Sequence, residues 1–168
     1  MMKNDYQWRT GRYCVFKNFV HLVFTTKYRK GVFTKEMLEI MEVAVKDSCK
    51  KMGGELLEFG GEGDHVHLFV SLSPKVALCH FVGRLKGASS YVIRKRFGSK
   101  IKEKLWGKHL WSPSYCAVSC GGASLDVIKE YVKNQRAPSS DRGVKQSIRE
   151  RGRTGDWSRV RIGKIRRA

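Results

Sequence analysis

Hydrophobic and polar positions along the chain predict four strands and three helices. Alternating apolar positions rich in β-branched and aromatic residues predict strands at 18–26, 55–62, 65–72 and 111–120. Apolar residues at helical spacing predict a helix that begins at the N-cap candidate Thr34 and ends before Gly53. A second helix is expected to begin at Ser73-Pro74, and a third to run from Ser124 to Gln135.

The order of these elements, β-α-β-β-α-β followed by a helix, predicts an α+β fold. This order is typical of the ferredoxin-like or RRM-like arrangement, a four-stranded antiparallel sheet with two helices on one face. The C-terminal helix, which bears a tyrosine, or a nucleic acid could cover the other face. We place one domain at residues 14–136. Residues 137–168 hold ten Lys/Arg against three Asp/Glu, so we expect a basic tail that is flexible until it meets DNA or a partner.

Composition narrows the class of partner. A net charge of +19 and a pI near 10.1 favour nucleic acid over an anionic membrane surface. No segment approaches the roughly 20 apolar residues that span a bilayer, and the N-terminus lacks the apolar core of a signal peptide. We therefore expect a cytoplasmic protein without a membrane partner. The five cysteines lack CxxC spacing, which favours reduced thiols over a zinc site.

Two polar pairs carry the candidate chemistry. His65 and His67 lie two residues apart in a predicted strand, so their imidazoles share one face and could bind one divalent cation. Tyr131 and Gln135 lie four apart in a predicted helix and also share a face. Together the pairs can form a metal site with a nucleophile beside it. The alternative is that the histidines only line a strand and the tyrosine is an ordinary core or surface aromatic.

Five ordered blocks of sequence resemble one known family. They are residues 20–29 (VHLVFTTKYR), 63–70 (GDHVHLFV), 81–89 (FVGRLKGAS), 110–116 (LWSPSYC) and 131–135 (YVKNQ). Over residues 18–136 the chain resembles the single-tyrosine HUH transposases of the insertion-sequence 200/605 family. The resemblance implies an enzyme that cuts single-stranded DNA beside hairpins at the ends of a mobile element and rejoins the strands. It also implies a homodimer in which the tyrosine helix of one subunit completes the metal site of the other.

The resemblance implies a role for each residue of the two pairs. Tyr131 would be the nucleophile that forms a 5′-phosphotyrosine, and His65, His67 and Gln135 would hold Mg²⁺ or Mn²⁺. Imidazole ligands alone would instead suggest zinc or another transition metal. Asp64 could orient an imidazole from behind the metal ligands, although a plain turn residue is an equal alternative.

The surrounding residues suggest how nucleic acid would be held. His21 matches a family position, and we expect it to form supporting hydrogen bonds rather than to bind metal. Phosphate contacts are expected from five basic residues, Lys27, Arg29, Arg84, Lys86 and Lys133. Two other functions remain open: a domesticated relative that processes repeat hairpins, and a non-catalytic RNA-binding module, since the same fold plan serves RNA recognition.

Overall fold

The computed structural model describes residues 8–105, 107–121 and 130, all within the unit formed by residues 1–136. Its strands are β1 (Arg9–Gly11), β2 (Cys14–Phe16), β3 (Phe19–Thr25), β4 (Glu55–Glu62), β5 (His65–Ser71) and β6 (Cys116–Cys120). Its helices are the short 3-10 turn η1 (Lys27–Arg29), α1 (Lys35–Lys51) and α2 (Leu78–Lys104). Among the described residues, no helix is long and apolar enough to cross a membrane.

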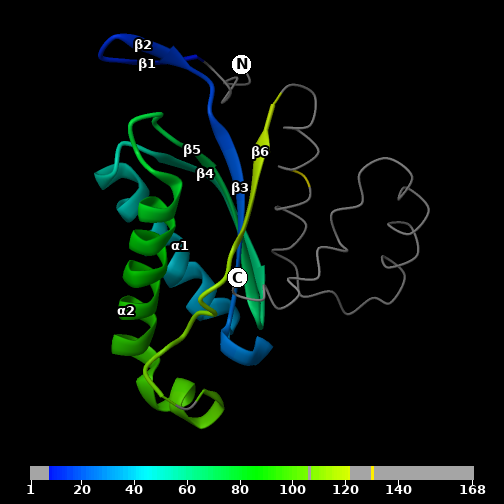
Figure 1. The fold of residues 1–168 in the computed structure, drawn as a ribbon. Helices are drawn as coiled ribbons and strands as arrows, with labels where there is room; N and C mark the ends of the chain where they lie inside the picture. The colour runs from blue at the N-terminus through cyan, green and yellow to red at the C-terminus, as the bar shows by residue number, and fades with distance from the viewer. Residues whose placement is uncertain (1–7, 106, 122–129, 131–168) are drawn as a thin grey trace, which may run out of the picture. The chain divides into compact units, whose positions relative to one another are not determined.

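The predicted fold class is confirmed. Strands β4, β5, β3 and β6 lie in that order in one antiparallel sheet, and α1 and α2 pack together against one face of it (Figure 1). A second, two-stranded sheet pairs β1 with β2. The order β3-α1-β4-β5-α2-β6 is the β-α-β-β-α-β order that the hydrophobic pattern predicts.

Alternation along β3 and β5 separates the two faces of the sheet. Val20, Leu22 and Phe24 of β3 are buried in the main core, opposite Val70, Leu68 and Val66 of β5 in the antiparallel register. The intervening residues lie on the other face, where Phe19, Phe69 and Cys120 form a second buried cluster. His21, His65 and His67 share the parity of that second face.

The first helix follows its predicted pattern. The Thr34 hydroxyl accepts a hydrogen bond from the Met37 amide at 3.4 Å, which caps the N-terminus of α1. Met37, Met41 and Val45 are buried at helical spacing. The helix ends before Gly53, whose φ of +69° is a conformation that glycine adopts without strain.

Two predicted boundaries are wrong. Helix α2 begins at Leu78, because the segment after Pro74 forms a turn in which the Val76 amide donates to the Ser73 carbonyl. Strand β6 begins at Cys116, while Trp111 forms only an isolated bridge with Thr26. The intervening Pro113 has no amide hydrogen to continue a strand ladder.

One element was not predicted, and one lies beyond the described residues. The β1–β2 pair, residues 9–16, is a tight hairpin whose strands have only three residues each, too short for a periodicity signal. The predicted third helix, 124–135, falls outside the described residues except for Glu130. The domain boundary at residue 136 and the basic tail stay predictions.

Candidate active site

The two candidate metal ligands lie at the start of β5 on the face of the sheet opposite α1 and α2. His65 pairs with Thr25 of β3, and His67 pairs with Val23. Their ring centroids are 5.0 Å apart and the ring planes are nearly perpendicular, at 81°. His67 is buried, whereas the His65 side chain retains 16% exposure. The predicted sharing of one face is therefore realised.

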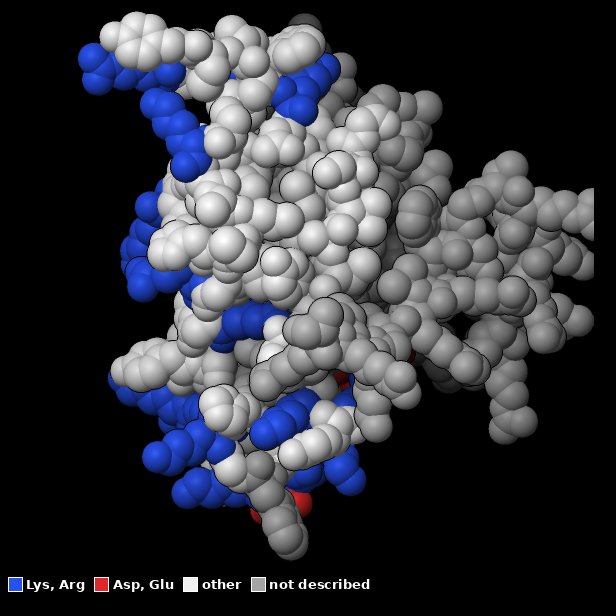
Figure 2. All heavy atoms as spheres, viewed as in Figure 1, with Lys and Arg blue, Asp and Glu red and all other residues white. Residues whose placement is uncertain are grey.

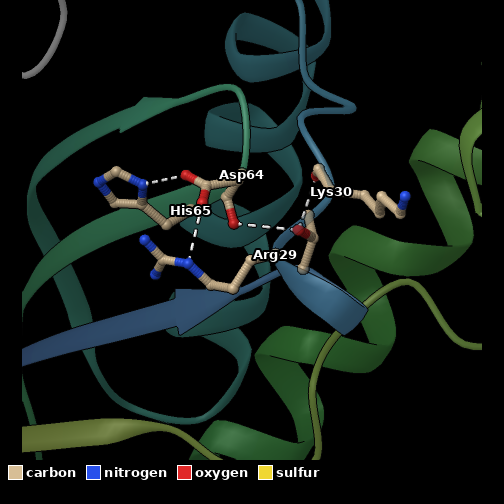
Figure 3. A network of polar contacts seen from close by, with 5 residues as sticks. Arg29, Lys30, Asp64 and His65 are labelled. Carbon is tan, nitrogen blue, oxygen red and sulfur yellow. Dashed lines mark hydrogen bonds and ion pairs between the residues drawn. The ribbon is translucent and has the colours of Figure 1, made fainter. Parts of the chain in front are cut away.

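The Asp64 carboxylate contacts the His65 ring at Nδ1. Its Oδ1 lies 2.6 Å from His65 Nδ1, and its Oδ2 lies 2.9 Å from Arg29 Nε (Figure 3). The carboxylate thus bridges a cation and an imidazole. With Nδ1 held by the carboxylate, His65 directs Nε2 away from Asp64, as in a carboxylate–histidine–metal arrangement.

The turn that carries Asp64 is fixed by backbone hydrogen bonds. The Asp64 carbonyl accepts from the Thr26 amide at 2.8 Å and from the Thr26 hydroxyl at 3.2 Å. The adjacent Gly63 carbonyl accepts from the amides of Val32 and Phe33 at 2.7 and 2.9 Å. These hydrogen bonds connect the β4–β5 turn to the segment that follows β3. They therefore hold the backbone in place immediately before His65.

Strained backbone places Arg29 beside Asp64. Tyr28 and Arg29 have φ values of +61° and +55°, in the left-handed region that non-glycine residues seldom occupy. Such conformations cost on the order of 1–3 kcal/mol each and cluster at functional sites. No local pattern predicts this pairing, because it depends on two segments 35 positions apart that meet where β3 ends and β5 begins.

His67 is supported by another histidine. His21 Nε2 lies 3.1 Å from His67 Nδ1, and the two rings stack with centroids 5.2 Å apart. Burial lowers the pKa of His67 to about 3, assisted by repulsion from His21 and His65, and burial lowers the pKa of His21 to about 4. Both imidazoles are therefore neutral at physiological pH, which is the form that binds metal.

The donor atoms fit a divalent cation. Because Nδ1 of each histidine is engaged by a neighbouring side chain, ligation by His65 and His67 would use Nε2 on both rings. In the part of the chain that the structure describes, no three His, Cys, Asp or Glu side chains form a metal cluster, so this half-site supplies two nitrogens. Gln135, the predicted third ligand, and the predicted nucleophile Tyr131 lie outside the described residues, as does Lys133.

Four of the candidate DNA-binding residues are described, and their environments differ. Arg84 is exposed on α2, and Arg29 is exposed although its Nε contacts Asp64. Lys27 lies with Nζ 5.2 Å from the centroid of the Tyr28 ring. In Figure 2, Lys and Arg side chains gather along the α2 side and at the lower end of the visible face, and few acidic atoms appear among them.

Lys86 already has protein partners. Its ammonium donates to the carbonyl oxygens of Ser112, Pro113 and Ser114 at 2.9, 3.4 and 2.8 Å. Burial lowers the pKa of Lys86 to about 8, which leaves it largely protonated at neutral pH. Lys86 therefore attaches the loop before β6 to α2, and a phosphate contact from it stays a prediction.

Comparison with known proteins identifies the family. The family model for IS200-like transposases matches residues 14–135, which include both polar pairs. The chain belongs to the IS200-like transposase family. A transposase of this family is a DNA-processing enzyme.

Individual relatives agree with this assignment. The chain is 35% identical over 129 residues to the ISDra2 transposase TnpA of Deinococcus radiodurans, covering 76% of this chain and 90% of that protein. It is 30% identical over 115 residues to the transposase for insertion sequence element IS200 of Salmonella typhimurium, covering 68% and 74%.

Solved structures agree as well. A crystal structure of a candidate transposase from Deinococcus radiodurans superposes with a TM-score of 0.62 at 32% identity, covering 77% of this chain and 98% of that one. A REP-associated tyrosine transposase bound to a REP hairpin superposes with a TM-score of 0.50 at 12% identity, covering 76% and 69%, and shares the fold.

The buried histidines predict how stability depends on pH. The imidazoles of the unfolded chain have a pKa near 6.5. In the folded protein burial lowers the pKa of His21 to about 4 and that of His67 to about 3. The unfolded state binds more protons between these values, so the free energy of unfolding should fall as pH drops through this window, by about 1 kcal/mol per pH unit for each histidine. Urea unfolding in metal-free buffer from about pH 7 to about pH 5 measures this slope. His21→Gln should flatten it, and an unchanged slope in that variant would contradict the assignment.

Lys86 and Arg84 form a matched pair for separating support of the fold from DNA binding. Lys86→Met leaves partly buried carbonyls without their donor and should lower the free energy of unfolding by about 1–3 kcal/mol. Arg84→Met removes an exposed charge on the same helix and should leave stability within about 0.5 kcal/mol. The DNA affinity of Arg84→Met should fall instead. The slope of log affinity against log salt concentration should become shallower by about 1, because one phosphate contact is lost. Equal stability of the two variants would refute the supporting role of Lys86.

Proposed function

We propose that this transposase cuts and rejoins single-stranded DNA at the ends of an insertion element by metal-assisted transesterification. Membership of the IS200-like family supports the biological class. The observation that carries the chemistry is the histidine pair, two imidazoles on one sheet face, each engaged through Nδ1 by Asp64 or His21. Side chains that only lined a strand would not need such support.

In this proposal the chain's own residues form the metal site in two parts. His65 and His67 supply Nε2 nitrogens from β5, and Gln135 supplies its amide oxygen. Asp64 and Arg29 keep the His65 ring in one orientation, while His21 does so for His67. A bound Mg²⁺ or Mn²⁺ would polarise a non-bridging oxygen of the scissile phosphate. Burial lowers the pKa of His67 to about 3, so this imidazole is uncharged at neutral pH and does not repel the cation.

Tyr131 is the proposed nucleophile. Its phenolic oxygen attacks phosphorus and the bond from phosphorus to the 3′-oxygen breaks, which yields a 5′-phosphotyrosine and a free 3′-hydroxyl. The phenol loses its proton and the departing 3′-oxygen gains one, so the step is balanced. Because the phosphotyrosine retains the energy of the phosphodiester, a different 3′-hydroxyl can reverse the attack and join new ends without ATP.

The proposed substrate is DNA that carries a hairpin near the cut. A protein of the same fold is bound to a REP hairpin, and the net charge of +19 suits a polyanion. Relatives that are 30–35% identical are insertion-sequence transposases, whereas the REP protein is only 12% identical. Mobile-element ends are therefore favoured over dispersed repeats. The metal half-site and the family favour an enzyme over an RNA-binding module.

We also propose a homodimer with composite sites. Gly121-Gly122 precedes the predicted tyrosine helix and would give the chain a joint there. The tyrosine helix of one subunit would then supply Tyr131 and Gln135 to the histidines of its partner.

Replacing the nucleophile tests the chemistry directly. Tyr131→Phe removes only the phenolic oxygen, so covalent protein–DNA adducts and cleavage of hairpin-bearing single strands should fall below detection while DNA binding persists. Tyr28→Phe is the matched control, because Tyr28 is exposed and near the site, and it should keep activity. Denaturing gels with end-labelled DNA measure both products. An adduct in Tyr131→Phe would move the nucleophile elsewhere, and cleavage that withstands EDTA would exclude the metal role.

Mixing inactive variants tests the assembly. Co-expressed His67→Ala and Tyr131→Phe subunits, each with a different affinity tag, are purified as heterodimers by tandem capture. Composite sites predict that one of the two sites is intact, with about half the cleavage of the parent protein under the dimer model. Each variant alone should be inactive. A verified heterodimer without cleavage would show that the tyrosine helix serves its own subunit.

A further inference from the structure

The N-terminal hairpin, residues 8–17 with strands β1 and β2, gathers several exposed large hydrophobic side chains in one short segment. Trp8, Tyr13 and Val15 are 65%, 91% and 61% exposed, so three large hydrophobic side chains lie in water within eight residues. The family match begins only at residue 14, within this hairpin. Figure 1 shows the hairpin beyond the end of the main sheet.

Cations accompany these rings. The segment contains Arg9, Arg12 and Lys17 and no Asp or Glu. The Arg12 guanidinium lies 5.1 Å from the centroid of the Tyr13 ring, and Lys17 Nζ lies 5.2 Å from that of Trp8. Each exposed aromatic ring therefore has a cation beside it. Lys and Arg atoms are visible over this hairpin in Figure 2.

The hairpin is anchored to the domain. Arg9 donates from Nη1 to the Ser71 hydroxyl at 3.1 Å and carbonyl at 3.4 Å, and from Nη2 to the Gly53 carbonyl at 3.1 Å. Its guanidinium also lies 5.4 Å from the Phe16 ring centroid. Arg9 thus fixes the hairpin to the ends of β5 and α1, and leaves Arg12 and Lys17 to face solvent.

The tip of the hairpin holds an unfavourable conformation. Tyr13 has a φ of +66°, which a bulky side chain adopts at a cost that glycine would avoid. The turn nevertheless carries the most exposed large hydrophobic side chain of the described residues. The Tyr13 ring contributes little to packing, so its strained and exposed position leaves it available for contact with a ligand.

We propose that the N-terminal hairpin is a second contact for single-stranded DNA, in which unpaired bases stack on Trp8 and Tyr13 while Arg12 and Lys17 neutralise the adjacent phosphates. Alternating rings and cations are the recognition chemistry of unpaired nucleic acid, because every base has a face that can stack. A second copy of the chain is disfavoured, since two such hairpins would bring only like charges together. The inference rests on the proposed function insofar as it takes single-stranded DNA as the substrate.

The location separates this contact from the cut. Arg9 binds Ser71 at the end of β5, whereas His65 begins the strand. Six residue steps of a strand span about 20 Å. At that separation the hairpin would meet DNA several nucleotides away from the scissile phosphate. The hairpin would therefore contribute to the affinity for DNA and to the course of the bound strand, and not to catalysis.

Comparing DNA with and without bases tests the proposal. The probes are a labelled oligothymidylate and an abasic oligomer of the same length, which keeps the phosphates but has nothing to stack. The full-length protein should bind the oligothymidylate about tenfold more tightly or better. The double variant Trp8→Ala/Tyr13→Ala should lose most of this preference. Arg12→Gln/Lys17→Gln should weaken the binding of both probes alike. It should also make the slope of log affinity against log salt concentration shallower by about 2. Val15→Ala, an exposed change in the same hairpin, is the control and should bind like the parent.

Several results would overturn the proposal. An unchanged preference for bases in Trp8→Ala/Tyr13→Ala would exclude stacking at the hairpin. A change of oligomeric state by analytical ultracentrifugation, with DNA binding unchanged, would assign the surface to self-association. The adduct assay separates this inference from the transposition proposal. If covalent adducts form but the variants of the N-terminal hairpin bind DNA like the parent protein, only the present inference is rejected. If those variants change DNA binding but no adduct forms, only the tyrosine chemistry is rejected.

Discussion

The antiparallel register between β3 and β5 is the constraint on which the candidate site depends. It pairs Leu22 with Leu68 in the core, and by the same alternation it places His21, His65 and His67 together on the opposite face. A slip of one residue would turn the apolar set to the wrong side. Burial of Leu22, Leu68 and their neighbours therefore fixes the position of the histidines as well.

Two uncharged histidines, His65 and one ion pair make up the described part of the site. His21 and His67 are uncharged because burial lowers their pKa values, even though the chain as a whole carries a net charge of +19. Asp64 supplies the negative charge beside His65 and is itself paired with Arg29. The strained turn that presents Arg29 is held by Thr26 and Leu110, whose carbonyls accept from the Arg29 and Lys27 amides. These contacts hold the two rings in fixed positions, as the proposed metal site would require.

Excess positive charge does not translate directly into DNA contacts. Arg9, Lys86 and Lys104 donate to backbone carbonyls of the protein itself and so hold loops in place. Arg84, Arg12 and Lys17 are exposed, and they are better placed for phosphates. Lys86 shows why the distinction escapes a sequence argument: its partners lie 26 to 28 positions away.

Local periodicity determined much of this protein. Alternation alone placed His65 and His67 on one face, and helical spacing identified Met37, Met41 and Val45 as core. The ordered motifs indicated the family, which the comparisons then showed. Only the tertiary structure decided that Arg29 meets Asp64, that His21 meets His67, that Lys86 attaches a loop, and that residues 8–17 form an anchored hairpin. The physical reason is that period and propensity describe neighbours along the chain, whereas these contacts join segments whose approach is set by sheet register and helix packing.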